Sequence, residues 1–174
     1  QVPWKLYKRG DQDGSEYVVY TRKPAGSKFS AYRLEAVLDS PLDVVARAAE
    51  KNIADPDFRP DNTVKTILKN DDEALLVHSH IKINAPFISD RDVISRVERS
   101  YDPETQTHLL SWSATDEGMP PQDGVIRLER SDGYWKFTPT EDNKTRAIYV
   151  SHTEIAGAVP AWVVNSIMSN TMVQ

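Results

Sequence analysis

Two histidines stand two positions apart, at His78 and His80, a spacing that places both side chains on one face of a β-strand. Imidazoles arranged in this way can bind a metal ion, with His108 or His152 as a third ligand. The apolar residues around them alternate with the histidines, so both imidazoles are expected to point away from these residues, to solvent or to the helix side. A metal site also needs convergent ligands held by further hydrogen bonds. The pattern therefore favours histidines that point away from the apolar residues, and no metal is expected.

Nucleophilic catalysis has no positive signal in this sequence. The chain contains no cysteine, which excludes disulfides, thiolate ligands and cysteine nucleophiles. No Gly-x-Ser-x-Gly turn is present to expose a serine. Arg91 stands between two aspartates and could bind a polar headgroup, but such an arginine is more often part of structural ion pairs. Arg127 alternates with its apolar neighbours and is expected on the outer face. We therefore expect no cofactor and no catalytic residue.

The composition is that of a folded protein, because 39% of the 174 residues are hydrophobic and 27% are charged. This length fits a single domain over residues 1–174 with a sizeable core. The net charge of −5 argues against nucleic acid as a partner, since phosphate binding requires a positive surface. The sequence starts at Gln1-Val2-Pro3 without methionine or an apolar run, so any signal peptide would already be gone. The localisation stays open between the cytoplasm and an exported, periplasmic state.

The first third of the chain predicts a hairpin followed by a helix. Residues 17–20 and 29–38 are rich in aromatic and β-branched side chains and are separated by Pro24-Ala25-Gly26-Ser27. Ser40 precedes Pro41, which predicts a serine N-cap and a proline at the first helical position. The helix is expected to run to about Ala54.

From 62 to 154, strand-like runs separated by polar turns predict an antiparallel meander, in a sheet of about seven to nine strands. The 20 residues from Ile155 to Gln174 carry no charge but contain too many polar side chains for a membrane span. Their apolar residues recur at helical spacing from Pro160 onward, which predicts a long amphipathic C-terminal helix. The expected fold class is α+β, with a curved sheet packed against this helix.

Three motifs in sequence order resemble the START family of lipid-transfer domains, within the Bet v 1-like helix-grip superfamily. They are Ser89-Asp90-Arg91-Asp92-Val93, then 115–120 followed by Gly124-Val125-Ile126-Arg127, and finally 157–165. The resemblance covers nearly the whole chain. It implies a helix-grip fold, in which a curved antiparallel sheet wraps around a long C-terminal helix and encloses an apolar cavity. It also implies non-enzymatic binding and transfer of a lipid or another apolar small molecule.

The same resemblance implies a lid formed by the loop 84–88 and the C-terminal helix. In this loop Pro86, Phe87 and Ile88 would expose apolar surface at a tip, where transient contact with a membrane is expected. Arg91 is expected to be structural or to bind a headgroup. Apolar side chains placed inward by alternation or by helical spacing are expected to line the cavity: Leu34, Val77, Ile81, Val93, Val97, Leu110, Trp112, Ile126, Leu128, Trp135, Phe137, Val164, Ile167, Met168 and Met172.

Sterol-carrying members of the family hold a buried glutamate–arginine pair in the cavity. The arginine position falls on Val97 here, and the glutamate position falls on His78 or Ser79, so the sequence weakens the case for sterol as cargo.

An alternative in the same superfamily is an aromatase/cyclase-like enzyme acting on a polyketide, which would place a group such as His78, Tyr149 or His152 inside the cavity. A third alternative is an interaction module with a filled core, which a cavity of roughly 300–1,000 Å³ would exclude.

Overall fold

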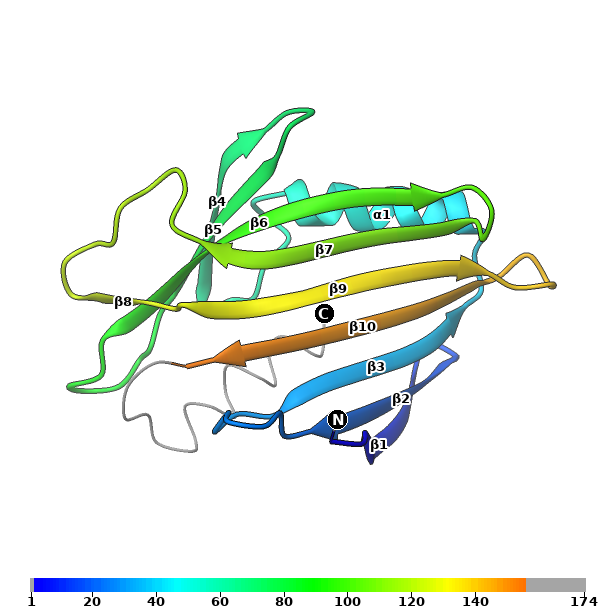
Figure 1. Ribbon diagram of the computed structural model, residues 1–174, viewed down its shortest axis with the longest axis horizontal. Helices are drawn as coiled ribbons and strands as arrows, with labels where there is room; N and C mark the ends of the chain where they lie inside the picture. Colours follow the sequence, from blue (N-terminus) through cyan, green and yellow to red (C-terminus); the bar gives the residue numbers. More distant parts are fainter. Residues whose placement is uncertain (1, 156–174) are drawn as a thin grey trace.

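The computed structural model describes residues 2–155, which form one strongly curved sheet with a helix on its concave side (Figure 1). Nine of the ten described strands are neighbours in one antiparallel path, whose order is β1 (Lys5–Gln12), β2 (Ser15–Arg22), β3 (Ala31–Leu38), β10 (Thr145–Glu154), β9 (Arg130–Pro139), β7 (Thr107–Thr115), β6 (Asp90–Asp102), β5 (Leu75–Ile81) and β4 (Thr63–Asn70). The three-residue β8 (Val125–Arg127) pairs with β6 in parallel. The expected curved antiparallel sheet is confirmed. The expected C-terminal helix lies outside the described residues.

The strand count exceeds the expected seven to nine because β1 was not recognised among its polar residues. A signal for β1 does exist in the two-residue turn Asp13-Gly14, where φ is 52° and 82°. Positive φ at both positions is typical of the tight turns that join hairpin strands. Both edge strands of the path, β1 and β4, also contain a register shift, between Leu6 and Lys8 and between Ile67 and Lys69. The predicted hairpin of β2 and β3 is confirmed.

The helix α1 (Leu42–Ala54) connects β3 to the far edge strand β4 and thereby crosses the concave side of the sheet (Figure 1). Its predicted end at Ala54 is confirmed, but the predicted serine cap is wrong. Pro41 is the N-cap residue, with φ −62° and ψ 152°, and no side chain caps the helix. The Ser40 carbonyl instead accepts a hydrogen bond of 2.8 Å from Oγ1 of the fully buried Thr145. The start of α1 is therefore attached to β10.

The other end of α1 is attached to β4. Nζ of Lys65 donates hydrogen bonds to the carbonyls of Asn52, at 2.8 Å, and Phe58, at 3.2 Å. Burial lowers the pKa of Lys65, while the nearby Asp55 carboxylate opposes this shift. The lysine thus binds carbonyls of the last helical turn and of the following loop, where a positive charge also complements the helix dipole.

Between these attachments, α1 packs on two parts of the core. Near its start, Val45 and Ala49 contact the cluster of Leu110, Phe137 and Ala147. Near its end, Ile53 contacts a second cluster: Leu75, Val77 and Val97. The helix is therefore held over β7, β9 and β10 at one end and over β5 and β6 at the other.

On the convex side of the sheet, a buried carboxylate ties strands to a long loop. Asp92 of β6 is completely buried and accepts hydrogen bonds from Nε and Nη2 of Arg127, at 2.8 and 2.9 Å. His78 Nε2 lies 2.9 Å from Oδ2 of Asp92, the oxygen that also accepts the hydrogen bond from Nη2 of Arg127. Arg127 also donates to the Met119 carbonyl at 3.2 Å. The outer-face position expected for Arg127 is confirmed, His78 lies on the same face, and the loop 116–124 is fastened to β5, β6 and β8 through them.

The ionisation of Asp92 contributes to stability through these contacts. Burial alone would raise the pKa of Asp92, but the hydrogen bonds and positive charges of Arg127 and His78 outweigh it and hold the pKa below its ordinary value. A carboxylate with a lowered pKa stabilises the folded state above its unfolded-state pKa of about 3.9. This contribution disappears as the pH falls through the lower folded-state pKa.

We expect Asp92→Asn to lower the free energy of unfolding by about 3 kcal/mol at pH 7, because Arg127 would stay buried without its counter-charge. Urea unfolding of both proteins measures this difference. The difference should shrink as the pH falls below about 4 and through the lower folded-state pKa of Asp92, where the wild-type carboxylate also becomes neutral. Asp123→Asn, at an exposed position in the same loop, is the matched control. An Asp92→Asn protein as stable as the wild type at pH 7 would contradict this account.

Candidate functional site

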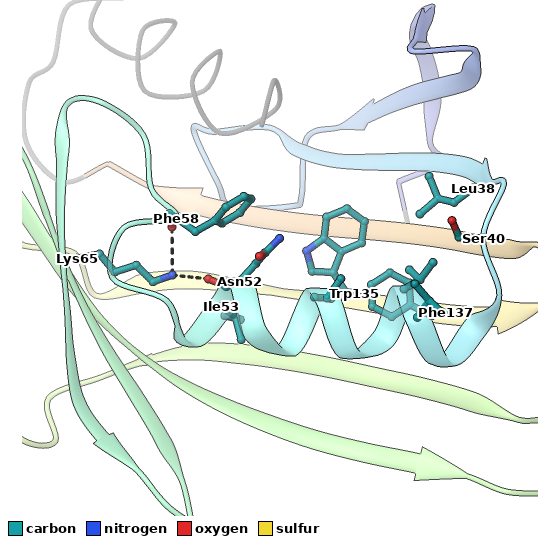
Figure 2. A pocket seen from close by; sticks show the side chains of 12 residues that line it. Leu38, Ser40, Asn52, Ile53, Phe58, Lys65, Trp135 and Phe137 are labelled. Atoms are coloured by element: carbon teal, nitrogen blue, oxygen red, sulfur yellow. Dashed lines mark hydrogen bonds between the residues drawn. The ribbon is translucent and has the colours of Figure 1, made fainter.

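A cavity of about 500 Å³ lies between α1 and the sheet. The small side chains of Ala48 and Ala49 on the helix leave this space open, and Trp135 and Phe137 of β9 form the facing wall (Figure 2). Lys65 is the charged residue in the described lining, and its amino group is turned to the two carbonyls that it binds (Figure 2). The rest of the lining is mostly apolar, so this first cavity suits a hydrocarbon chain.

A second cavity of about 240 Å³ lies further along the concave side, where side chains of β4, β5, β6, β7, β9 and β10 converge. Its apolar lining comes mainly from Ile81, Val93, Trp112 and Leu128. The other lining side chains are largely hydroxyls. None of the described lining residues is charged. The second cavity therefore combines apolar side chains with uncharged hydroxyls, whereas the described lining of the first includes the charged Lys65.

Four stacked rings separate the two cavities. Trp135 stacks on Phe137 with ring centroids 5.5 Å apart, and Tyr149 lies 4.7 Å from Trp135 and 5.6 Å from Trp112. Trp135 lines the first cavity, whereas Tyr149 and Trp112 line the second. Stacked and tilted rings at these separations add to the stability gained from their burial. The ring cluster is thus a shared wall between the cavities.

Close packing of Trp112 requires glycine at position 133. A Cβ at Gly133 would collide with the indole of Trp112, which lies flat over the β9 backbone. Burial raises the pKa of the Tyr149 phenol, although a hydrogen bond with Ser151 opposes this shift. Tyr149 therefore stays protonated at neutral pH and can donate a hydrogen bond toward the second cavity.

The structure brings six of the expected lining residues to the two cavities: Trp135 and Phe137 in the first, and Ile81, Val93, Trp112 and Leu128 in the second. Val77, Val97 and Leu110 pack into the core beneath α1. Leu34 pairs with Tyr149 across β3 and β10, on the inner face. Ile126 alternates with Arg127, which faces outward, and is half-buried. The remaining expected residues, Val164, Ile167, Met168 and Met172, lie outside the described residues.

Two of the three residues expected to be exposed in the loop 84–88 are exposed. Phe87 is fully exposed and has φ 62°, and Pro86 is exposed as well. The expected exposure of Ile88 is wrong, because its side chain packs against the buried Ile155 in a cluster with Ile81 and Ile83. Ile88 therefore anchors the loop, and Phe87 is its exposed tip.

Polar contacts fix the base of this loop. Asp90 accepts a hydrogen bond of 2.8 Å from the backbone N–H of Ile83, and its other oxygen lies 2.7 Å from His80 Nε2. Arg91 is buried, and its guanidinium donates to the Ser89 carbonyl. The position of Arg91 next to the loop agrees with the expected structural role. It does not line either cavity.

Sequence reasoning missed two groups of lining residues. The first is the inner face of α1, where small and apolar residues recur at helical spacing through Val45, Ala49 and Ile53. The second is the hydroxyl set, of which Ser79 and Ser95 stand between apolar inward residues on β5 and β6. Period-2 alternation could have placed both serines on the inner face.

The histidines contact partners outside the two cavities. His152 Nε2 lies 3.1 Å from Ser27 Oγ, and the ring of His108 packs 4.5 Å from that of Tyr101. His78 and His80 face the carboxylates described above. Within residues 2–155, no three histidine or carboxylate side chains are grouped to hold a metal ion. No helix in that part of the chain is long and apolar enough to cross a membrane.

Comparisons with known proteins agree with this architecture. The model of the START domain family matches residues 1–174. An uncharacterized protein of Pseudomonas aeruginosa is 30% identical over 166 residues, which cover 94% of this chain and 78% of that protein. The human mitochondrial steroidogenic acute regulatory protein is 27% identical over 179 residues, covering 99% of this chain but 61% of that protein.

Among solved structures, the crystal structure of a STAR-related lipid transfer protein from Xanthomonas axonopodis superposes with a TM-score of 0.74. The two sequences are 22% identical, and the superposition covers 95% of this chain and 89% of the other. That likeness shows a shared fold, and the family model extends over the whole sequence. The chain therefore belongs to the START domain family.

Proposed function

We propose that residues 1–174 form one domain that binds a lipid and transfers it between membranes without catalysing a reaction. The observation that carries this proposal is the apolar cavity of about 500 Å³ between α1 and the stacked rings of β9. A volume of this size is typical of small-molecule sites, which span roughly 300–1,000 Å³. Binding would be driven by removal of apolar surface from water, at about 25 cal/mol per Å².

The names of similar proteins support the same class of function. The Xanthomonas axonopodis protein is described as a lipid transfer protein, and it shares this fold over 95% of the chain. The human relative is described as a steroidogenic acute regulatory protein. Neither name identifies the cargo of this chain.

The alternative, an aromatase/cyclase-like enzyme, has less support from the cavity chemistry. Of the three side chains considered for such a role, Tyr149 faces the second cavity, whereas His78 and His152 contact partners elsewhere. The described lining of that cavity contains no histidine or carboxylate that could act as a base beside Tyr149. This arrangement supports a carrier.

We further propose that the loop 84–88 and the C-terminal segment form the gate of the cavity. Cargo can exchange only if some element opens, and loops with few buried contacts open most easily. The loop is anchored by Ile88 and Asp90, while Phe87 presents its ring to solvent next to Pro86. An exposed aromatic ring at a loop tip is suited to enter the apolar part of a membrane surface.

Filling the first cavity should block binding. We expect Ala48→Trp to reduce the affinity for a fluorescent acyl-chain lipid at least about tenfold, because the indole would occupy the space of the ligand. The fold should persist, since Ala48 borders open space and not the packed core. Arg47→Trp, on an exposed position of the same helix, is the matched control. Equal affinity of Ala48→Trp and the wild type in a fluorescence titration would rule out this cavity as the binding site.

Replacing the exposed ring of Phe87 tests the gate proposal. We expect Phe87→Asp to slow the transfer of a fluorescent lipid between phosphatidylcholine vesicles several-fold, while the equilibrium affinity stays the same. Stability should change by no more than about 0.5 kcal/mol, because an exposed loop tip has few contacts to lose. Tyr101→Asp provides a comparison at an exposed aromatic position outside the loop and outside both cavities. Transfer by Phe87→Asp at the wild-type rate would contradict the gate proposal and leave the binding proposal standing.

A further inference from the structure

The second cavity is unusually rich in hydroxyl groups for an interior surface. Seven of its twelve lining residues carry a hydroxyl, and none of the twelve carries a charge. Ser131, Ser151, Thr153 and Tyr149 come from β9 and β10, whereas the others come from β4, β5 and β6. The two sets therefore come from parts of the sheet on either side of β7.

The hydroxyls of β9 and β10 have partners among themselves. Ser131 Oγ lies 3.1 Å from Thr153 Oγ1, and Tyr149 is hydrogen-bonded with Ser151. On the other side of β7, Ser79 of β5 and Ser95 of β6 occupy diagonal positions on adjacent strands. Within residues 2–155, neither of these two side-chain hydroxyls has a hydrogen-bond partner. This part of the lining therefore presents free donors and acceptors to the cavity.

The hydroxyls of the lining restrict the chemistry of a ligand that could bind in the second cavity. Interior hydroxyls are nearly always hydrogen-bonded, so Ser79 and Ser95 require partners from water or from a ligand. A carboxylate or phosphate would lose its hydration here without meeting a counter-charge, which is costly. Lys65 lines the first cavity and binds two carbonyls, and Arg91 lines neither cavity and donates to the Ser89 carbonyl.

The number of hydroxyls also matters. A single alcohol, such as that of a sterol, takes part in at most three hydrogen bonds. Seven hydroxyls from two parts of the sheet suit a head that carries several oxygens and can bond to both sets. The first cavity, behind the ring cluster, offers apolar space for attached chains.

We propose that the second cavity binds the uncharged head of a neutral glycerolipid, a mono- or diacylglycerol, with Ser79 and Ser95 bonding to its hydroxyl and ester oxygens. This inference rests on the proposed lipid-binding function and specifies the class of lipid.

The experiment compares acyl lipids that differ in the head, together with cholesterol as a lipid with a single hydroxyl. The full chain is incubated with phosphatidylcholine vesicles containing a fluorescent diacylglycerol, phosphatidylcholine, fatty acid or cholesterol, and binding and transfer are measured for each. We expect the diacylglycerol to bind most tightly, by about tenfold or more. Ser79→Ala combined with Ser95→Ala should then weaken diacylglycerol binding by about tenfold or more, since each hydrogen bond contributes about fivefold.

Two further variants separate the hydroxyl groups from general effects on the fold. Ser79→Thr combined with Ser95→Thr keeps both hydroxyls and should retain most of the binding. Ser113→Ala, on an exposed position of β7, should leave binding unchanged. The alanine pair should still bind a simple hydrocarbon probe as the wild type does, because the apolar cavity is untouched.

The outcomes distinguish this inference from the proposed function. Tightest binding of a phospholipid, fatty acid or cholesterol by the wild type, or unchanged diacylglycerol binding by the alanine pair, would overturn the glycerolipid assignment while lipid binding stands. Absence of binding for every labelled lipid would overturn the proposed function itself. The ranking of lipids uses the wild type alone, so it decides the question even if the alanine pair does not fold.

Discussion

The site depends on the way α1 is held over the concave side of the sheet. Thr145 of β10 binds the carbonyl just before the helix, and Lys65 of β4 binds carbonyls at its end. These strands are far apart in the sheet, so the helix is fixed at two distant points. Small side chains in its middle, Ala48 and Ala49, then leave space that a tightly packed helix would fill. The cavity follows from this two-point attachment.

The two faces of the sheet deal with polar groups in different ways. On the convex face, charges are paired at short distance, as in the contacts of Asp92 with Arg127 and His78. On the concave face, the second cavity contains hydroxyls without charges. A buried charge without a close partner costs much more free energy than a neutral hydroxyl whose hydrogen bonds are made by water or a ligand. The ionic contacts of Asp92 thus lie on the convex face, and the described lining of the second cavity is uncharged.

The sequence predicted the parts of the fold that repeat a simple pattern. Alternation along Leu110 and Trp112, and again along Trp135 and Phe137, placed these side chains on the concave face. It could not tell which of them border a cavity and which fill the core, because both environments select apolar side chains. Leu110 packs under α1, whereas Trp112 lines the second cavity, and this difference depends on the path of the helix.

Local signals failed where tertiary contacts decide the structure. Ser40 resembled a helix cap, but its carbonyl serves as an acceptor for Thr145, a residue distant in sequence. Ile88 resembled an exposed tip residue, but it is half-buried against Ile155. The hydroxyl lining was overlooked because serine on a strand is usually interpreted as solvent-exposed. The family resemblance supplied what periodicity could not, namely the expectation that the concave side encloses a cavity.

The register shifts in the two edge strands of the path have a consequence for how molecules meet one another. An unpaired strand edge is a template on which another chain can add a strand, and long flat edges promote aggregation. In β1 and β4 the irregular positions adjoin Lys8 and Lys69, so each edge is locally irregular and carries charged side chains, those of Lys69, Asp71 and Glu73 in ion pairs. Edge-to-edge association between copies is thereby disfavoured.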